Sequence, residues 1–137
     1  EQGCKAHIIN TASVGGLLAS PLMAPYSASK FAVVALTESL QAELAMLQLP
    51  IKVSLLCPGP VTSEIFNASV TKATERPEVS GFLQTMQQQL QDNGISPAEL
   101  AAFAFEGIAA GDFWILPKAE ALKPAYEEKV AAILAAM

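Results

Sequence analysis

Two side chains capable of acid–base chemistry lie four residues apart, a phenol at Tyr26 and an amine at Lys30. Residues at i and i+4 share one face of a helix, with their Cβ atoms about 5–6 Å apart. A cation that close to a phenol lowers the pKa of the phenol, and the amino end of a helix acts in the same direction. The pair therefore predicts a general acid or base that works near neutral pH. The same pair also occurs on solvated helix faces without a function, and this alternative stays open at this point.

The elements that would position this pair are a strand, a long helix and a second strand. Residues 7–11 and 51–57 are short β-rich runs, and residues 26–47 contain neither Pro nor Gly. Leucines recur in the helix at the spacing of one face, at Leu36, Leu40, Leu44 and Leu47. A strand–helix–strand unit indicates parallel strands, and ligands of such sheets bind beyond the carboxyl ends of the strands. Ser13 and Pro58-Gly59, which follow the two strands, are therefore expected to border one crevice with Tyr26.

The remainder of the chain predicts helices and one more strand. We expect a Gln-rich helix at 83–90, a strand at 113–116 and an amphipathic helix at 124–136. Ser96-Pro97-Ala98-Glu99 matches a capping box with proline in the first turn, so a helix is expected from there to Gly111. No internal repeat or linker divides the sequence. We predict one α/β domain over residues 1–137 with a mostly parallel sheet of at least three strands.

Charge, hydrophobic content and cysteine count exclude several classes of protein. The 137 residues carry 8 basic and 13 acidic side chains, a formal net charge of −5, and 52% of them are hydrophobic. This balance excludes intrinsic disorder and argues against nucleic acid and anionic membranes as partners. No run reaches the roughly 18 apolar residues of a membrane span. Cys4 and Cys57 are too few for a disulfide framework, so a cytoplasmic location is expected.

Three stretches taken together resemble the short-chain dehydrogenase/reductase family. They are Ile8-Ile9-Asn10-Thr11-Ala12-Ser13, Tyr26-Ser27-Ala28-Ser29-Lys30 and Cys57-Pro58-Gly59-Pro60-Val61. The resemblance implies a Rossmann-type parallel sheet and an NAD- or NADP-dependent oxidoreductase that interconverts a small-molecule alcohol and a carbonyl compound. Carried over to this sequence, it implies that Tyr26 is the acid/base and that Ser13 hydrogen-bonds the substrate oxygen. Lys30 would support Tyr26 and hold the nicotinamide ribose.

The resemblance also implies further contacts with the cofactor. Tyr26, Lys30, Pro58, Gly59, Val61 and Ser63 are the residues at the matching positions. The family pattern after Pro-Gly continues x-Val-x-Thr, so Ser63 is a departure that keeps the hydroxyl group. Residues 61–95 correspond to the substrate-covering region of the family. There, Ile65, Phe66, Phe82, Leu83 and Met86 would line an apolar pocket, or else pack locally within a helix.

The main departure from the family pattern is the absence of its phosphate-binding segment from this sequence. Family members open with a strand and a glycine-rich turn that cradles the pyrophosphate, and this sequence contains neither. Gly15-Gly16 does not replace that turn, and Asn10 is not the family's catalytic asparagine, which precedes this strand. The sequence begins Glu1-Gln2-Gly3 and enters a strand at once, so we expect it to be the second half of a family member.

A second hypothesis follows from this departure. The chain by itself would be a non-catalytic folded fragment or an oligomerisation module of such an enzyme. In the family, the helix that corresponds to residues 26–47 packs against its counterpart in another subunit. A homodimer or homotetramer through this helix is therefore expected under either hypothesis.

Other residue patterns favour structural roles. Ser27-Ala28-Ser29-Lys30 matches the Ser-x-x-Lys pattern of penicillin-binding proteins, but the companion motifs of those enzymes are absent. His7 is expected to be a structural histidine, since no residue at ligand spacing accompanies it. Cys57 is expected to be an inert buried thiol. Residues 113–115 predict a buried strand rather than an exposed patch, and the glutamines of 83–90 a solvated helix face.

Overall fold

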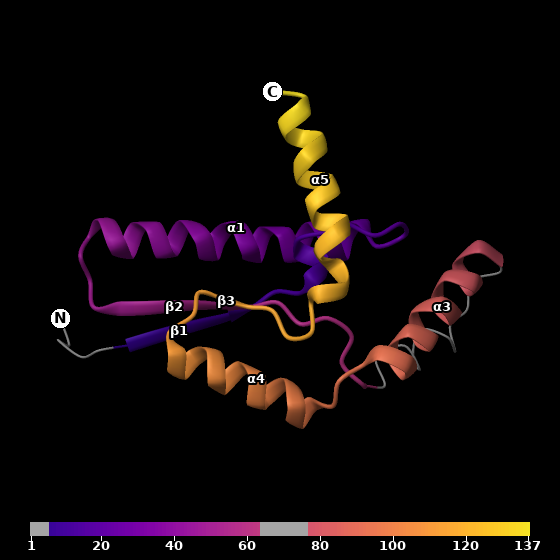
Figure 1. The fold of residues 1–137 in the computed structure, drawn as a ribbon, viewed down its shortest axis with the longest axis horizontal. Coiled ribbons are helices and arrows are strands. Elements are labelled where there is room, and N and C mark those ends of the chain that lie inside the picture. The colour runs from indigo at the N-terminus through magenta and orange to yellow at the C-terminus, as the bar shows by residue number, and fades with distance from the viewer. Residues whose placement is uncertain (1–5, 64–76) are drawn as a thin grey trace. The chain divides into compact units, whose positions relative to one another are not determined.

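The computed structural model describes residues 6–63 and 77–137. The described residues fall into two compact units, 6–59 with 103–137, and 60–63 with 77–102. The first unit contains the parallel sheet and the predicted catalytic group (Figure 1). The second contains the region expected to cover a substrate.

The sheet has three parallel strands in the order β1-β2-β3. They are β1 (Ala6–Thr11), β2 (Ile51–Leu56) and β3 (Trp114–Ile115). Ala6 pairs with Ile51 and Thr11 with Leu56, so β1 and β2 end at the same level. The predicted strand at 113–116 is shorter than expected, although the Phe113 carbonyl still accepts a hydrogen bond from the Leu55 N–H at 2.6 Å. The predicted α/β class with a parallel sheet is confirmed.

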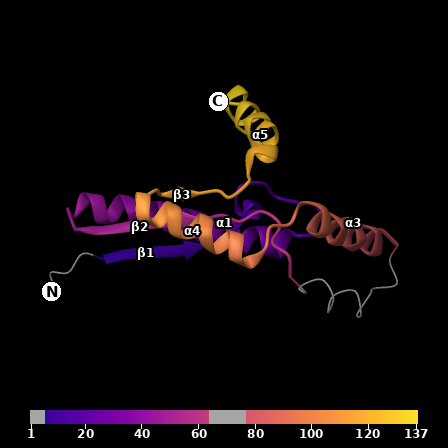
Figure 2. The same ribbon diagram turned by 60° about the horizontal axis from the view of Figure 1, so that its bottom comes forward.

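Helices cover both faces of this sheet (Figure 2). Helix α1 (Ala24–Met46) lies on one face, and the second half of α4 (Pro97–Ala110) lies on the other. Gly107 of α4 permits close packing, because a Cβ there would stand 2.7 Å from the Ile115 side chain. The core at the centre consists of buried Ala12, Val34, Leu55 and Cys57, with Leu17, Val33 and Phe113 packed around them.

The face that α1 turns toward the core is not its leucine stripe. The buried residues of α1 are Ser27, Val34, Thr37 and Leu44. Leu36 and Leu47 are each 61% exposed. Of the four predicted stripe positions, only Leu44 is buried, and Leu40 is half-buried.

Polar side chains tie β1 to its neighbours. Asn10 donates from Nδ2 to the Thr37 hydroxyl at 3.0 Å, and that hydroxyl donates to a carbonyl of its own helix. His7 Nε2 lies 2.8 Å from the hydroxyl of the fully buried Ser54, which donates to the Asp112 carbonyl at 2.5 Å. His7 is thus a structural residue, as predicted, and Asn10 also connects β1 to α1.

The last two elements of the first unit are a short 3-10 helix, η2 (Glu120–Leu122), and helix α5 (Lys123–Ala135). The helix agrees with the prediction for 124–136, but it carries no buried residue. Its apolar side chains are partly or largely exposed, with Val130 at 36% and Leu134 at 64%. The predicted helix is present, but its apolar side chains do not form a buried face.

The second unit is built around α3 (Pro77–Asn93), which extends beyond the predicted 83–90 at both ends. Gln84, Gln88 and Gln89 are exposed, as predicted, whereas Gln87 is half-buried. Val61 forms an isolated parallel bridge with Ile95, and the Thr62 N–H donates to the Ile95 carbonyl at 2.9 Å. The capping box is confirmed, because the Ser96 N–H donates to the Glu99 carboxylate at 2.8 Å and Ser96 Oγ accepts from the Glu99 N–H at 3.1 Å.

Candidate active site

Ser13 sits at the carboxyl end of β1, where a 3-10 turn begins. It caps the amino end of η1 (Val14–Gly16), and its hydroxyl oxygen accepts from the Gly15 N–H at 3.1 Å. The hydroxyl also lies 3.4 Å from the Pro58 carbonyl, to which it donates. These contacts fix the Ser13 side chain between the end of β1 and the turn that follows β2.

Tyr26 lies against the same turn from the first turn of α1. A Cβ built on Gly15 would stand 2.9 Å from Tyr26 Cε1 and 3.6 Å from Ser13 Oγ. Both side chains therefore border the same glycine. Tyr26 is 39% exposed, so its phenol can be reached from solvent. The predicted juxtaposition of Ser13 and Tyr26 is present in the structure.

At Gly16, the next residue, the turn packs directly against the backbone of α1. A Cβ at this position would lie 2.7 Å from the Lys30 carbonyl oxygen and 3.0 Å from a Val34 methyl group. The residue has no room for a side chain. The sequence did not predict that Gly15 and Gly16 connect the serine to the helix. Two adjacent glycines directly after Ser13 and Val14 were the available signal.

Lys30 extends along the same edge of the sheet. Its ammonium group lies 5.9 Å from the centre of the Tyr26 ring and donates to the Thr11 carbonyl at 3.5 Å. Thr11 is the last residue of β1. The carbonyl therefore holds the cation near the phenol at the carboxyl end of the strand.

Cys57 lies beneath this group and takes no part in acid–base chemistry. It is fully buried. Burial raises the pKa of the Cys57 thiol to about 11, against the opposing effects of a hydrogen bond from the Ser13 backbone and the charge of Lys30. At neutral pH the thiol stays protonated and is a poor nucleophile. This agrees with the prediction of an inert buried cysteine.

The turn after β2 borders the site. The Pro58 carbonyl accepts from the Val14 N–H at 3.0 Å, which holds the turn beside Ser13. No described atom lies within 4 Å of the place where a Cβ would stand on Gly59. Val61 and Ser63 belong to the second unit, in which Ser63 is exposed and the Thr62 hydroxyl donates to the Ile95 carbonyl at 3.2 Å.

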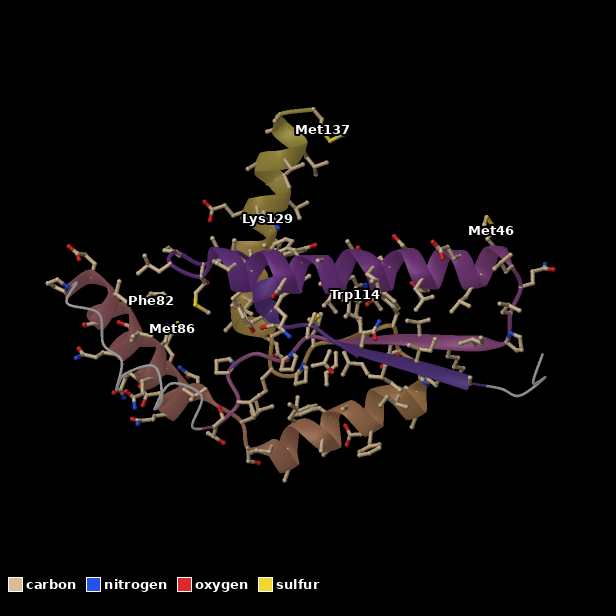
Figure 3. All side chains as sticks on the ribbon, turned by 180° about the vertical axis from the view of Figure 1, so that it is seen from behind. Met46, Phe82, Met86, Trp114, Lys129 and Met137 are labelled. Atoms are coloured by element: carbon tan, nitrogen blue, oxygen red, sulfur yellow. The ribbon has the colours of Figure 1, made fainter. Side chains whose placement is uncertain are left out.

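The other predicted candidates have different surroundings. Ser27 is buried on the core side of α1, and its hydroxyl has no hydrogen-bond partner among the described residues, so it is not placed to attack a substrate. Phe82, Leu83 and Met86 are half-buried along α3, from which Figure 3 shows Phe82 and Met86 projecting. Ile65 and Phe66, expected to line a pocket with them, lie outside the described residues, as does Cys4.

Residues 6–63 and 77–137 contain neither a cluster of metal ligands nor a membrane-spanning helix. In these ranges no three His, Cys, Asp or Glu side chains are grouped as metal ligands. Within the same ranges, none of the helices combines the length and the apolar character needed to cross a bilayer.

Comparisons with known proteins identify the family to which this fold belongs. The model of a family described as short chain dehydrogenase matches residues 1–74. A short-chain dehydrogenase/reductase from Burkholderia phymatum, solved in complex with NAD, is 34% identical with a TM-score of 0.79. The match covers 92% of this chain and 47% of that one.

Two curated relatives extend the comparison to named enzymes. The CLA biosynthesis dehydrogenase/reductase of Lactiplantibacillus plantarum is 27% identical over 98% of this chain and 50% of its own length. The NADPH-dependent 3-dehydrocapnine reductase of Ornithobacterium rhinotracheale is 29% identical over 75% of this chain and 38% of its own. The chain thus spans half or less of the length of these relatives.

Proposed function

The chain belongs to the short-chain dehydrogenase/reductase family, and on that premise we propose that it supplies the catalytic group of an NAD(P)-dependent oxidoreductase that interconverts an alcohol and a carbonyl compound. The observation that supports the proposal is that the Tyr26 ring and the Ser13 hydroxyl both border Gly15, with the Lys30 ammonium 5.9 Å from the centre of the phenol ring. Proton transfer at the phenol and stabilisation of charge on the substrate oxygen require such an arrangement.

In the proposed oxidation, the Tyr26 oxygen takes the hydroxyl proton of the alcohol. The C–H bond at the carbinol carbon breaks with its electron pair, and the C=O double bond forms. Ser13 donates a hydrogen bond to the substrate oxygen, on which negative charge develops. The positive charge of Lys30 stabilises the phenolate that receives the proton. In the reduction, the same groups return the proton to the oxygen.

The residues present fit the nicotinamide end of a dinucleotide. When bound, this cofactor accepts or donates the hydride. The Lys30 ammonium and the Tyr26 hydroxyl are the donors that would hold its ribose hydroxyls, while Gly59 offers open space at the adjoining turn. Pro58 and Gly59, with Val61 and Ser63 of the second unit, are the further contacts we propose. The cofactor-bound family member from Burkholderia phymatum supports this assignment.

The experiment is a rate measurement on the full-length natural protein, following NADH or NADPH absorbance with a ketone. Tyr26→Phe removes only the phenol oxygen, and we expect turnover to fall by about 10²–10⁴-fold. Ser13→Ala should also lower the rate, whereas Ser39→Ala, on the exposed side of α1, should leave it unchanged. A Tyr26→Phe variant that turns over at the original rate would refute the assignment.

One observation favours the alternative of a non-catalytic fragment or an oligomerisation module. The chain spans 50% of the curated Lactiplantibacillus plantarum relative and contains no glycine-rich phosphate turn. Under this alternative the 137 residues alone do not bind a dinucleotide. Titration with NADH, observed by cofactor fluorescence, separates the two cases: binding at micromolar concentration rejects the alternative.

A further inference from the structure

Asn10 and Thr37 join β1 to α1 by a hydrogen bond whose direction is fixed. The Thr37 hydroxyl is fully buried and donates to the Val33 carbonyl at 2.6 Å. Since a hydroxyl has only one proton to donate, this oxygen accepts from Asn10, whose Nδ2 lies 3.0 Å away. The Asn10 amide group therefore has one orientation, and the bond is a specific link between the strand and the helix.

This link lies on the face of α1 that carries Lys30. Thr37 follows Lys30 by seven residues, which is about two helical turns, so the two side chains share one face of the helix. Asn10 directly precedes Thr11, whose carbonyl accepts from the Lys30 ammonium at 3.5 Å. The same strand and the same helix are therefore connected at two points, and one of these points is the predicted catalytic lysine.

Of the two bonds, the one between Asn10 and Thr37 is better suited to fix α1 along β1. Its length of 3.0 Å is ordinary for an N–H···O bond, whereas the 3.5 Å bond of Lys30 is long and is made by a flexible side chain. The close packing of Gly16 on the Lys30 backbone limits how near the turn comes to α1, but a packing contact has no preferred direction along the helix. Loss of the Asn10–Thr37 bond would let α1 shift along β1, together with Tyr26 and Lys30.

The turn that Ser13 caps is held by elements other than α1. The Val14 N–H donates to the Pro58 carbonyl at 3.0 Å, in the turn that follows β2. At the other end of η1, Lys129 of α5 donates from Nζ to the Leu17 carbonyl at 2.7 Å. A shift of α1 along β1 would therefore change the distance between the Ser13 hydroxyl and the side chains that α1 carries.

We propose that Asn10 and Thr37 are positioning residues, which set the place of Tyr26 and Lys30 relative to Ser13. They act through the helix rather than on the substrate. A displacement of about 1 Å at a reacting group can lower a rate by about 10²-fold. The proposal rests on the proposed function and adds two residues outside the catalytic group to it. Its test includes a distance measurement, so that the two can fail separately.

Two substitutions of Thr37 in the full-length natural protein separate the hydroxyl from the packing. Thr37→Val keeps the branched shape and removes the hydroxyl, and we expect kcat to fall by about 10–100-fold with the KM for the ketone close to its original value. Thr37→Ser keeps the hydroxyl and removes a buried methyl group. It should lower the stability but leave kcat close to that of the wild type. A role in stability alone would not give this order of kcat values.

Ser54→Ala is the matched control, because it removes a buried hydroxyl from another link of β1. Ser54 Oγ lies 2.8 Å from His7 Nε2 and donates to the Asp112 carbonyl. Since His7 and Asn10 are three residues apart in a strand, their side chains lie on opposite faces of the sheet. We expect Ser54→Ala to lower the urea midpoint and to leave kcat unchanged. If circular dichroism shows that Thr37→Val does not fold, Asn10→Ala takes its place with the same expected fall in kcat.

Crystal structures of the full-length wild type and the Thr37→Val variant give the second measurement. We expect the distance between the Tyr26 and Ser13 hydroxyls, or that between Lys30 Nζ and the Thr11 carbonyl, to change by more than about 0.5 Å. Unchanged distances, an original kcat in Thr37→Val, or an equal loss of kcat in Thr37→Ser or Ser54→Ala would each overturn the proposal. Changed distances together with full turnover in Tyr26→Phe would reject the proposed function and leave the positioning of the helix standing.

Discussion

At the scale of single residues, two glycines bring the chemistry together. The absence of a side chain at Gly15 leaves room for the Tyr26 ring close to this glycine, which the Ser13 hydroxyl also borders, and Gly16 allows the turn to contact the backbone of α1. The two contacts differ in kind, because one partner is a side chain that can rotate and the other is a helix backbone that cannot. Substitutions at these neighbouring positions should therefore affect different properties.

We expect Gly15→Ala to lower turnover and Gly16→Ala to lower stability. The new methyl group at position 15 would displace the Tyr26 ring, whereas at position 16 it would meet the Lys30 carbonyl at 2.7 Å. Overpacking against a rigid partner costs about 1–3 kcal/mol. Rates and urea denaturation of both variants check this. Equal losses of stability with equal rates would contradict it.

The Cys57 thiol gives the folded state a pH dependence. Burial raises its pKa from 9.0 to about 11, so the unfolded chain releases this proton at lower pH than the folded protein. The resulting stability is complete below pH 9 and is lost as the pH rises toward 11. We expect the difference in unfolding free energy between wild type and Cys57→Ala to shrink by about 2 kcal/mol over this range. Denaturation at several pH values measures it, and a constant difference would argue against the raised pKa.

At the scale of elements, the ends of the helices are set by local hydrogen bonds. Helix α4 begins with the reciprocal bonds between Ser96 and Glu99. Helix α1 ends where Gln48 adopts a left-handed φ of 53° and the Leu49 N–H donates to the Leu44 carbonyl at 3.1 Å. This pattern is a Schellman motif, which usually places glycine at the position that Gln48 occupies.

Gln48→Gly should therefore stabilise the fold. A side chain in the left-handed region costs about 1–2 kcal/mol, and part of that gain is offset by the greater freedom of glycine in the unfolded chain. We expect a net increase of about 0.5–1 kcal/mol in the free energy of unfolding. Thermal unfolding of the variant checks the sign, and Gln41→Gly, within the same helix, should have the opposite effect.

At the scale of the whole molecule, α1 presents an apolar surface away from its own core. Leu36 and Leu47 are largely exposed and Leu40 is half-buried, along one side of the helix. Exposed apolar stripes of this kind often mark interfaces between proteins. We propose that a second copy of the chain covers this stripe, in a homodimer or homotetramer.

Leu36→Glu should then lower the oligomeric state of the full-length natural protein, because a charge would be buried without a partner in the interface. Sedimentation velocity measures the change. The exposed Glu38→Gln on the same helix serves as a control and should leave the mass unchanged. A Leu36→Glu protein that keeps its original mass would place the interface elsewhere.

The sequence by itself determined the parallel α/β class, the long helix after Pro25, the capping box at Ser96 and the order of Ser13, Tyr26 and Lys30. These features depend on local spacing, turn chemistry and short-range hydrogen bonds, which a single sequence records. Only the tertiary structure decided which face of α1 is buried, how closely Gly15 and Gly16 approach that helix, and where Lys129 attaches α5. Those outcomes depend on contacts between residues far apart in the chain, such as the 2.7 Å bond from Lys129 to Leu17, and no local pattern encodes them.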